Sequence, residues 1–227
     1  MMTPITKTVH QIWTTHELPV QFKSFAESWK RFLPDWEYKL WSHKENRDFV
    51  AEFFPGFLAK YDSYPKDMQR IDAAKYLILK KLGGLYADTD VECLDNIEVL
   101  IKDADCVMGK EPYWHASRYH MKYIVGSAFI YSKPDSDFMN SVCRKLYEYP
   151  TVDVNYPIDI LKSTGPLLLT SAYNEYEKKD RINLYEPEYL YPIGMGDLSR
   201  ILANDMPKQM TEAINNAYAI HYFWGMW

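Results

Sequence analysis

The sequence lacks a disulfide framework, a long apolar run and an excess of positive charge. Its three cysteines form no CxxC pair, so neither paired disulfides nor a zinc ribbon is indicated, and a reducing compartment fits best. No stretch reaches the roughly 18 apolar residues of a membrane span, and no apolar run follows residues 1–7. A net charge of -5 argues against a nucleic-acid partner, which would need clustered lysine and arginine. We therefore expect a cytoplasmic protein without a transmembrane segment, and peripheral contact with the inner face of the membrane stays open.

Aromatic residues are what the sequence has in abundance. The 227 residues include 19 Tyr, 10 Phe and 7 Trp, and flat rings with polar tips suit sugars and bases as well as protein cores. A hydrophobic fraction of 47% and a charged fraction of 25% are those of an ordinary globular protein. Because no repeat, low-complexity tract or linker marks a boundary, we predict one domain over residues 1–227.

The opening of the chain has a β-α-β pattern. Residues 8–13 form a short apolar segment, residues 19–32 repeat their aromatic and aliphatic side chains at helical spacing, and residues 36–40 alternate with a period of two. This order is typical of a parallel sheet with helical crossovers, in which ligands bind at the carboxyl ends of the strands. Trp13 is expected near that edge.

A helix is predicted over residues 67–82, with a double glycine as its stop. The short segment 85–87 then reads as a strand whose end presents Asp88 and Asp90, because alternate residues of an extended segment share a face. Further on, the pattern predicts strands over 105–109 and 123–131 and helices over 135–147 and 166–178.

Asp88 and Asp90 are the leading candidates for chemistry. Two carboxylates on one face, with coordination positions left over, suit a hard divalent cation such as Mg²⁺ or Mn²⁺, and a pyrophosphate could fill those positions. A bare D-x-D also arises by chance in surface loops, so its context has to support the assignment.

That context resembles glycosyltransferase family 32. The run from Arg70 to Asp90 has the family's helix, double glycine, tyrosine and acidic pair, and the similarity extends to residues 9–13, 163–166 and 221–227. The family includes yeast-type initiating mannosyltransferases, bacterial capsule and lipopolysaccharide enzymes, and relatives of clostridial glucosylating toxins. The resemblance implies an α/β fold of GT-A type with a mixed central sheet flanked by helices. It also implies a nucleotide-sugar donor, a Mn²⁺ or Mg²⁺ ion and retention of anomeric configuration.

The resemblance gives roles to the residues near the acidic pair. Trp13 matches a tryptophan that stacks on the donor base, although a core position is an equal alternative. Asp72 and Lys75 match residues near the donor sugar and ribose; read locally, they are three apart on one helix and could be a surface ion pair worth about 0.3 kcal/mol. Lys75 stands where the family usually has arginine and lacks its planar fork. Tyr86 is either core packing or a hydroxyl directed at the donor.

The end of the chain carries the remaining candidates. His221 resembles a family histidine that could join the two aspartates on the metal, with a satisfied core histidine as the alternative. Trp224 and Trp227 match tryptophans that cover the pyrophosphate, while Met226 stands where relatives often have serine. Ser127 lies near a position where asparagine is common.

The resemblance implies a retaining hexosyltransferase acting on a glycan acceptor, with surface polysaccharide synthesis as the setting. Relatives use UDP-galactose, UDP-glucose, UDP-N-acetylhexosamines or GDP-mannose, and we expect a UDP-hexose as the donor. Asp72, Lys75 and Asp88 are then the expected catalytic residues. One alternative is a haloacid-dehalogenase-like phosphatase, in which the first Asp of D-x-D attacks phosphorus, but Glu92 replaces the Thr or Val expected there. A second is a carbohydrate-binding module with structural calcium, which explains the aromatic content but not the helix-glycine-aspartate block.

Overall fold

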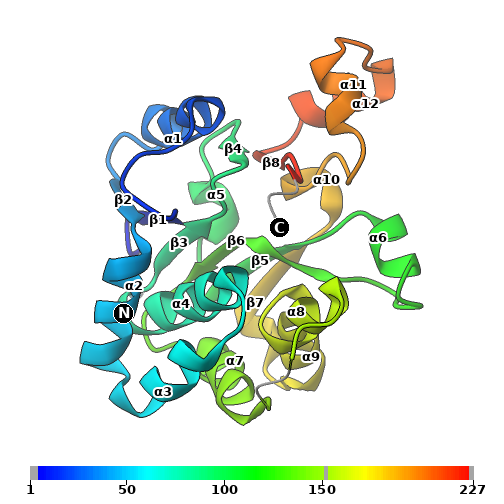
Figure 1. Cartoon of the computed structure of the whole chain (residues 1–227). Helices are drawn as coiled ribbons and strands as arrows, with labels where there is room; N and C mark the ends of the chain where they lie inside the picture. Colours follow the sequence, from blue (N-terminus) through cyan, green and yellow to red (C-terminus); the bar gives the residue numbers. More distant parts are fainter. Residues whose placement is uncertain (1–4, 151–152, 225–227) are drawn as a thin grey trace.

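The computed structural model describes residues 5–150 and 153–224, which form a helix-covered six-stranded sheet and a two-stranded sheet (Figure 1). The strands are β1 Thr8–Ile12, β2 Glu37–Trp41, β3 Gly84–Ala87, β4 Val91–Cys93, β5 Cys106–Lys110, β6 Val125–Ser132, β7 Ile182–Tyr185 and β8 Ala219–His221. The helices are α1 Val20–Phe32, α2 His43–Phe53, α3 Pro55–Ser63, α4 Asp67–Leu82, α5 Glu98–Ile101, α6 Tyr113–Ser117, α7 Asp137–Glu148, α8 Pro157–Ser163, α9 Pro166–Glu175, α10 Pro187–Leu190, α11 Leu198–Leu202 and α12 Lys208–Asn215, with a 3-10 turn at Lys179–Arg181.

The larger sheet is mixed, as predicted. Its order is β2-β1-β3-β6-β5-β7, in which β1 runs parallel to β2 and β3, β6 runs antiparallel to β3 and β5, and β7 runs parallel to β5. All strands except β6 therefore end at the same edge of the sheet. The loops that follow β1, β3 and β5 therefore leave the sheet at this edge.

Alternation along the strands divides the core between the two faces of the sheet. In β3, Leu85 and Ala87 pack on one side with α1 and α5, whereas Tyr86 packs on the other side with α2, α3, α4, α7 and α9. A four-residue strand that is buried on both faces needs such a continuous apolar sequence.

The turn between α4 and β3 determines how the chain enters the strand that leads to the acidic pair. Gly83 and Gly84 have φ of 68° and 97°, a region that favours glycine, and a Cβ on Gly84 would lie 2.6 Å from the carbonyl oxygen of Thr8. The buried α4 therefore ends at this turn, and the chain enters β3 directly beside β1.

Most of the predicted elements are present, with small shifts at their ends. The helix over 67–82 is confirmed as α4, and the parallel β-α-β opening is confirmed as β1, α1 and β2. The predicted helix over 166–178 ends early, at Glu175, because Tyr176 turns to extended backbone. Strands β4, β7 and β8 and helices α2, α3, α5, α6, α8, α10, α11 and α12 were not predicted from the sequence. Within the residues described, no helix is both long and apolar enough to cross a membrane.

Candidate active site

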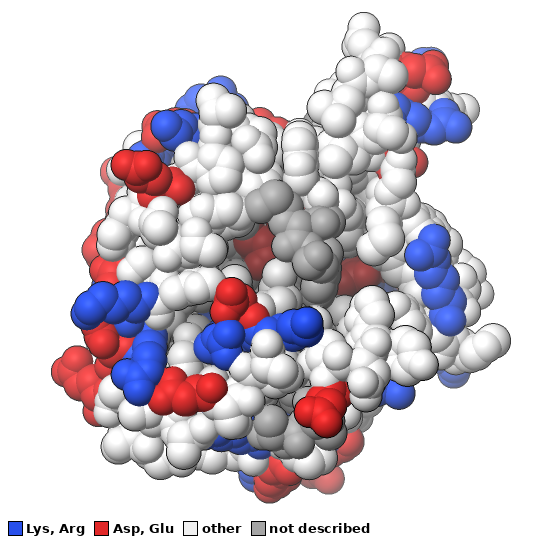
Figure 2. All heavy atoms as spheres, viewed as in Figure 1, with Lys and Arg blue, Asp and Glu red and all other residues white. Residues whose placement is uncertain are grey.

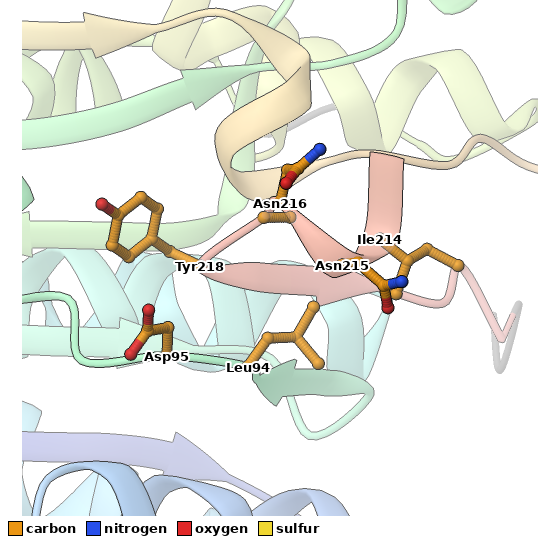
Figure 3. Close-up of a pocket in the computed structure, with 7 residues that line it drawn as sticks. Leu94, Asp95, Ile214, Asn215, Asn216 and Tyr218 are labelled. Carbon is orange, nitrogen blue, oxygen red and sulfur yellow. The ribbon is translucent and has the colours of Figure 1, made fainter. Parts of the chain in front are cut away.

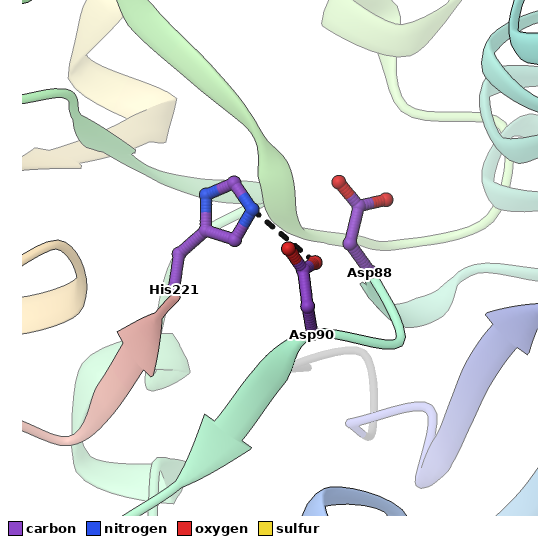
Figure 4. Close-up of side chains that lie close together, drawn as sticks. All are labelled: Asp88, Asp90 and His221. Atoms are coloured by element: carbon purple, nitrogen blue, oxygen red, sulfur yellow. Dashed lines mark ion pairs between the residues drawn. The ribbon is translucent and has the colours of Figure 1, made fainter. Parts of the chain in front are cut away.

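Asp88, Asp90 and His221 come together at the edge where β3 ends (Figure 4). Each offers one ligand atom, and these atoms lie within 4.8 Å of one another. Asp88 directly follows β3 and Asp90 directly precedes β4. His221 arrives because β8 pairs antiparallel with β4, which places it opposite Val91. The three-residue strand β8 thus brings His221, which is distant in the sequence, next to the D-x-D pair.

Asp88 is held by both its side chain and its backbone. The Tyr86 hydroxyl donates to Asp88 Oδ1 at 2.7 Å, and the Asp88 amide donates to the Ala128 carbonyl at 2.9 Å. The Gln11 side chain donates to the Asp88 carbonyl at 2.9 Å, and Gln11 in turn accepts a hydrogen bond from the Tyr38 hydroxyl at 2.7 Å. These bonds fix the carboxylate while Oδ2 has no donor among the described residues.

Asp90 contacts two residues of the C-terminal segment, His221 and Trp224. His221 Nε2 lies 3.3 Å from Asp90 Oδ1, and the Trp224 amide donates to Asp90 Oδ2 at 2.9 Å. The side chains of Asp90 and His221 are 16% and 13% exposed, so the pair is largely removed from water without being sealed. Figure 2 shows acidic atoms inside a hollow near the middle of the face viewed.

Burial and mutual charge separate the pKa values of the three groups. Burial raises the pKa of Asp88 above its usual range, with Lys75 opposing and Asp90 adding to this effect. For Asp90, burial is outweighed by the charge and hydrogen bond of His221, and the pKa lies below its usual range. For His221, burial lowers the pKa, but Asp90 and Asp88 together raise it above 6.5. The negative charges of the two carboxylates therefore favour the protonated form of the imidazole.

The three groups fit a hard divalent cation. Two carboxylate oxygens and one imidazole nitrogen form a donor set that Mg²⁺ or Mn²⁺ accepts, and His221 Nδ1 is buried without a hydrogen-bond partner among the described residues. A cation would compensate the repulsion between the two aspartates.

Asp72 and Lys75 form a buried ion pair, so the interpretation as a surface pair is wrong. Their charged atoms are 2.6 Å apart and their side chains are 5% and 1% exposed, because α4 is enclosed by neighbouring elements. Thr164 donates to Asp72 Oδ2 at 3.0 Å, and Lys75 donates to the Ser127 hydroxyl at 3.2 Å. Local spacing placed the two residues on one face of the helix but gave no information on its burial.

Trp13 and Trp224 both contact the ring of one phenylalanine, Phe22. Their rings contact Phe22 in edge-on geometry, with centroid distances of 5.5 Å for Trp13 and 5.7 Å for Trp224. Trp13 is only half-buried at the end of β1, as expected for a residue at the strand edge. Trp227 and Met226, which the sequence analysis also named, lie outside the described residues.

Two residues that donate hydrogen bonds to Asp88 and Asp72 were given no site role from the sequence. Gln11 belongs to the His-Gln-Ile-Trp segment and Thr164 to the Ser-Thr-Gly-Pro segment, so the similarity had marked both stretches. Their contacts join positions 77 and 92 residues apart, which no local pattern predicts.

A cavity of about 420 Å³ lies at the opposite end of the β4–β8 pair (Figure 3). Its lining consists of Leu94, Asp95, Ile214, Asn215, Asn216, Ala217 and Tyr218. Asp95 and Tyr218 are the titratable groups in this lining, and neither belongs to the group of potential metal ligands. We therefore place the candidate active site at Asp88, Asp90 and His221.

Comparison with known proteins identifies relatives of this chain. Residues 19–107 match the family model described as the glycosyltransferase sugar-binding region containing the DXD motif. Inositol phosphoceramide mannosyltransferase 3 of Schizosaccharomyces pombe is 33% identical over 180 residues, covering 77% of this chain and 46% of that protein. Mannosyl phosphorylinositol ceramide synthase SUR1 of Saccharomyces cerevisiae is 26% identical over 190 residues, covering 82% and 47%. The chain spans about half the length of these curated relatives.

The fold is also that of a glycosyltransferase. The solved structure of PaToxG glycosyltransferase matches with a TM-score of 0.52 at 16% identity, covering 95% of this chain and 89% of the other. This likeness confirms the predicted α/β fold of GT-A type. With the acidic pair inside the matched region, the chain belongs to the DXD-containing glycosyltransferases of family 32.

Proposed function

We propose that this chain transfers a hexose from a nucleotide-diphosphate sugar to an acceptor hydroxyl, with a divalent cation bound by Asp88, Asp90 and His221. The observation that carries the proposal is the convergence of these three ligand atoms, within 4.8 Å, at the strand-end edge of the sheet. The bound cation would neutralise the charge that grows on the leaving diphosphate.

The protein's own groups orient the carboxylates and the donor. Tyr86 and the Trp224 amide hold one oxygen each of Asp88 and Asp90, which limits how far either carboxylate can rotate. Trp13 is assigned to stack on the donor base, and Trp224 to cover the diphosphate together with Trp227. Both described rings contact Phe22, which supports an aromatic wall on one side of the donor.

Asp72 and Lys75 are assigned to the donor sugar and ribose through their buried ion pair. Lys75 lies beside Asp88 and its charge lowers the pKa of that carboxyl, although burial is the larger effect. Lysine offers a point charge where the family usually has arginine, so a planar two-pronged contact with the donor is not available to this chain.

The reaction is proposed to retain anomeric configuration. A bond forms between the acceptor oxygen and the anomeric carbon, and the bond from that carbon to the diphosphate oxygen breaks on the same face. The acceptor proton moves to a diphosphate oxygen. We assign no covalent nucleophile among the carboxylates of this chain.

The donor and acceptor classes are proposed from two sources. A UDP-hexose donor and a surface-polysaccharide acceptor follow from the family resemblance, and the cytoplasmic location stays a prediction. The names of the relatives in the two yeasts support mannose as the sugar and add inositol phosphoceramide as an acceptor. We therefore include mannose donors and a hydroxylated lipid head group in the test.

The test is donor hydrolysis with Mn²⁺ across a panel of nucleotide sugars, comparing the intact protein with Asp90→Asn. Losing one carboxylate charge should remove most metal-dependent turnover. Asp35→Asn, a change at an exposed aspartate outside the site, serves as the matched control. Equal turnover in the intact protein and Asp90→Asn would rule out the assignment, and trapping of a phosphoaspartate would favour the phosphatase alternative.

A further inference from the structure

Glu111 is a further carboxylate at the active edge of the sheet. It directly follows β5, which ends at the same edge as β1 and β3, and its side chain is 13% exposed. Neither the metal-ligand group nor the donor assignments use it. An acidic side chain that is largely buried and yet keeps contact with solvent is costly to maintain unless it is well paired.

The pairing of Glu111 leaves one of its oxygens free. His115 Nδ1 lies 2.8 Å from Glu111 Oε2, and the Met195 amide donates to His115 Nε2 at 2.9 Å. Because Nε2 accepts from that amide, the ring proton lies on Nδ1 and is donated to Glu111. The histidine is therefore held as a neutral donor, while Glu111 Oε1 has no donor among residues 5–150 and 153–224.

A continuous row of rings connects this pair to the proposed metal site. Phe223 lies between the two histidines, with ring centroids 4.8 Å from His115 and 4.0 Å from His221. The Glu111–His115 pair therefore lies one phenyl ring away from the ligand group.

A cavity of about 330 Å³ lies between α6 and the segment from α10 to Asp197, and its lining begins at Pro112, the residue after Glu111. Tyr113 and Trp114, which follow Glu111 and Pro112, form one wall, and Tyr191 forms another. Tyr113 is 72% exposed, so a large aromatic face is open to a ligand. Tyr191 also lies against His221, at a centroid distance of 5.9 Å, so the cavity and the ligand group share a wall.

The charge of the lining selects among ligands. The lining includes two carboxylates, Glu188 and Asp197, and no lysine or arginine among the described residues; Arg118, whose guanidinium lies 4.8 Å from the Trp114 ring centroid, is outside this lining. Such a lining disfavours a diphosphate, whereas aromatic faces beside carboxylate acceptors suit the C–H face and the hydroxyls of a neutral ring. The cavity is thus unsuited to the donor's nucleotide.

Close packing fixes the position of the indole in this wall. Gly194 lies so near Trp114 that a Cβ there would be 2.4 Å from the indole ring. The indole is therefore pressed against backbone rather than against a flexible side chain, which reduces the cost of ordering it when a ring stacks on it.

We propose that this cavity binds a neutral polyhydroxylated ring of the acceptor, stacked on Trp114 and Tyr113, and that Glu111 accepts a hydrogen bond from an acceptor hydroxyl. The proposal rests on the proposed glycosyl transfer. It assigns the ring-binding face to α6 and the positioning of the hydroxyl to the carboxylate that follows β5.

Direct binding tests the cavity without turnover. Saturation-transfer NMR would follow methyl α-mannopyranoside, methyl β-galactopyranoside and myo-inositol with the intact chain, Trp114→Ala and Tyr156→Ala. Tyr156, an exposed tyrosine (69%) that directly precedes α8 and does not line the cavity, serves as the control. Binding by the intact chain and Tyr156→Ala, with loss in Trp114→Ala, is expected; no binding of any probe by the intact chain would overturn the proposal.

Transfer kinetics then test the carboxylate. With an active donor, Trp114→Phe and Glu111→Gln should each raise the acceptor KM by about tenfold, while the dissociation constant for Mn²⁺ and the nucleoside diphosphate stays unchanged. Melting curves establish that each variant is folded. An unchanged acceptor KM in both variants would overturn the proposal. Ring binding without any metal-dependent donor turnover would instead refute the proposed transferase function.

Discussion

The imidazole of His10 holds the turn that leads into the acidic pair. His10 Nε2 lies 3.0 Å from the Gly83 carbonyl oxygen, and the Trp41 indole donates to His10 Nδ1 at 3.1 Å. Because Nδ1 accepts a hydrogen bond, the proton lies on Nε2 and is donated to Gly83, so the ring is neutral. The histidine of β1 thus ties β2 and the α4–β3 turn to the strand between them.

His10 should make stability depend on pH in the mildly acidic range. Burial, together with Lys39 and against the Gly83 hydrogen bond, lowers its pKa from 6.5 to about 4. Between these values the unfolded chain binds a proton that the folded chain does not, so stability falls as pH falls. The unfolding free energy has its full value above pH 6.5, where neither state binds this proton. It falls by about 3 kcal/mol as the pH decreases towards 4.

Urea unfolding at several pH values measures this effect. The difference in unfolding free energy between the intact protein and His10→Gln should shrink as pH falls from 6.5 towards 4. His120→Asn, at an exposed histidine, should show no such trend. A constant difference for His10→Gln across this window would contradict the assigned protonation state.

Gln11→Leu should weaken cation binding without touching a proposed ligand. The change removes the 2.9 Å hydrogen bond to the Asp88 carbonyl and leaves the Tyr38 hydroxyl without its acceptor. Loss of such supporting bonds lowers metal affinity by roughly 10- to 100-fold. Titration with Mn²⁺, followed by the EPR signal of the free ion, measures it, and affinity equal to that of the intact chain would remove Gln11 from the site.

The Asp72–Lys75 pair should show strong energetic coupling. Lys75→Met leaves the Asp72 carboxylate buried with Thr164 as its remaining donor, and breaking a buried pair in this way costs about 3–5 kcal/mol. Adding Asp72→Asn to Lys75→Met should recover part of that loss. Denaturant unfolding of the two single variants and the double variant measures the coupling, and additive losses would show that the residues act independently.

Gly84→Ala should destabilise the fold by about 2 kcal/mol or more, because a Cβ would meet the Thr8 carbonyl and φ is 97°. Gly56→Ala, inside α3 with open space around its Cβ position, should instead be neutral or stabilising by about 0.5–1 kcal/mol. Thermal unfolding compares the two variants. Equal effects would mean that the α4–β3 turn tolerates a side chain.

Features that depend on neighbouring residues could be predicted from the sequence, whereas features that depend on tertiary contacts could not. The α4 periodicity and the two glycines predicted both the helix and the strand tip that presents Asp88, because each step involves neighbouring residues. The burial of Lys75 could not be predicted, since it depends on which elements enclose α4. Glu111 was missed because its place beside the site depends on β5 running parallel to β3 with β6 between them. The single-domain assignment stays a prediction.

The most direct test of the central claim is a crystal soaked with Mn²⁺ and UDP, with the ion located by its anomalous scattering. Our account predicts an anomalous peak coordinated by Asp88, Asp90 and His221, and in contact with both phosphates of the nucleotide. A bound nucleotide whose manganese ion is held elsewhere, with Asp88 and Asp90 turned to bulk solvent, would contradict it.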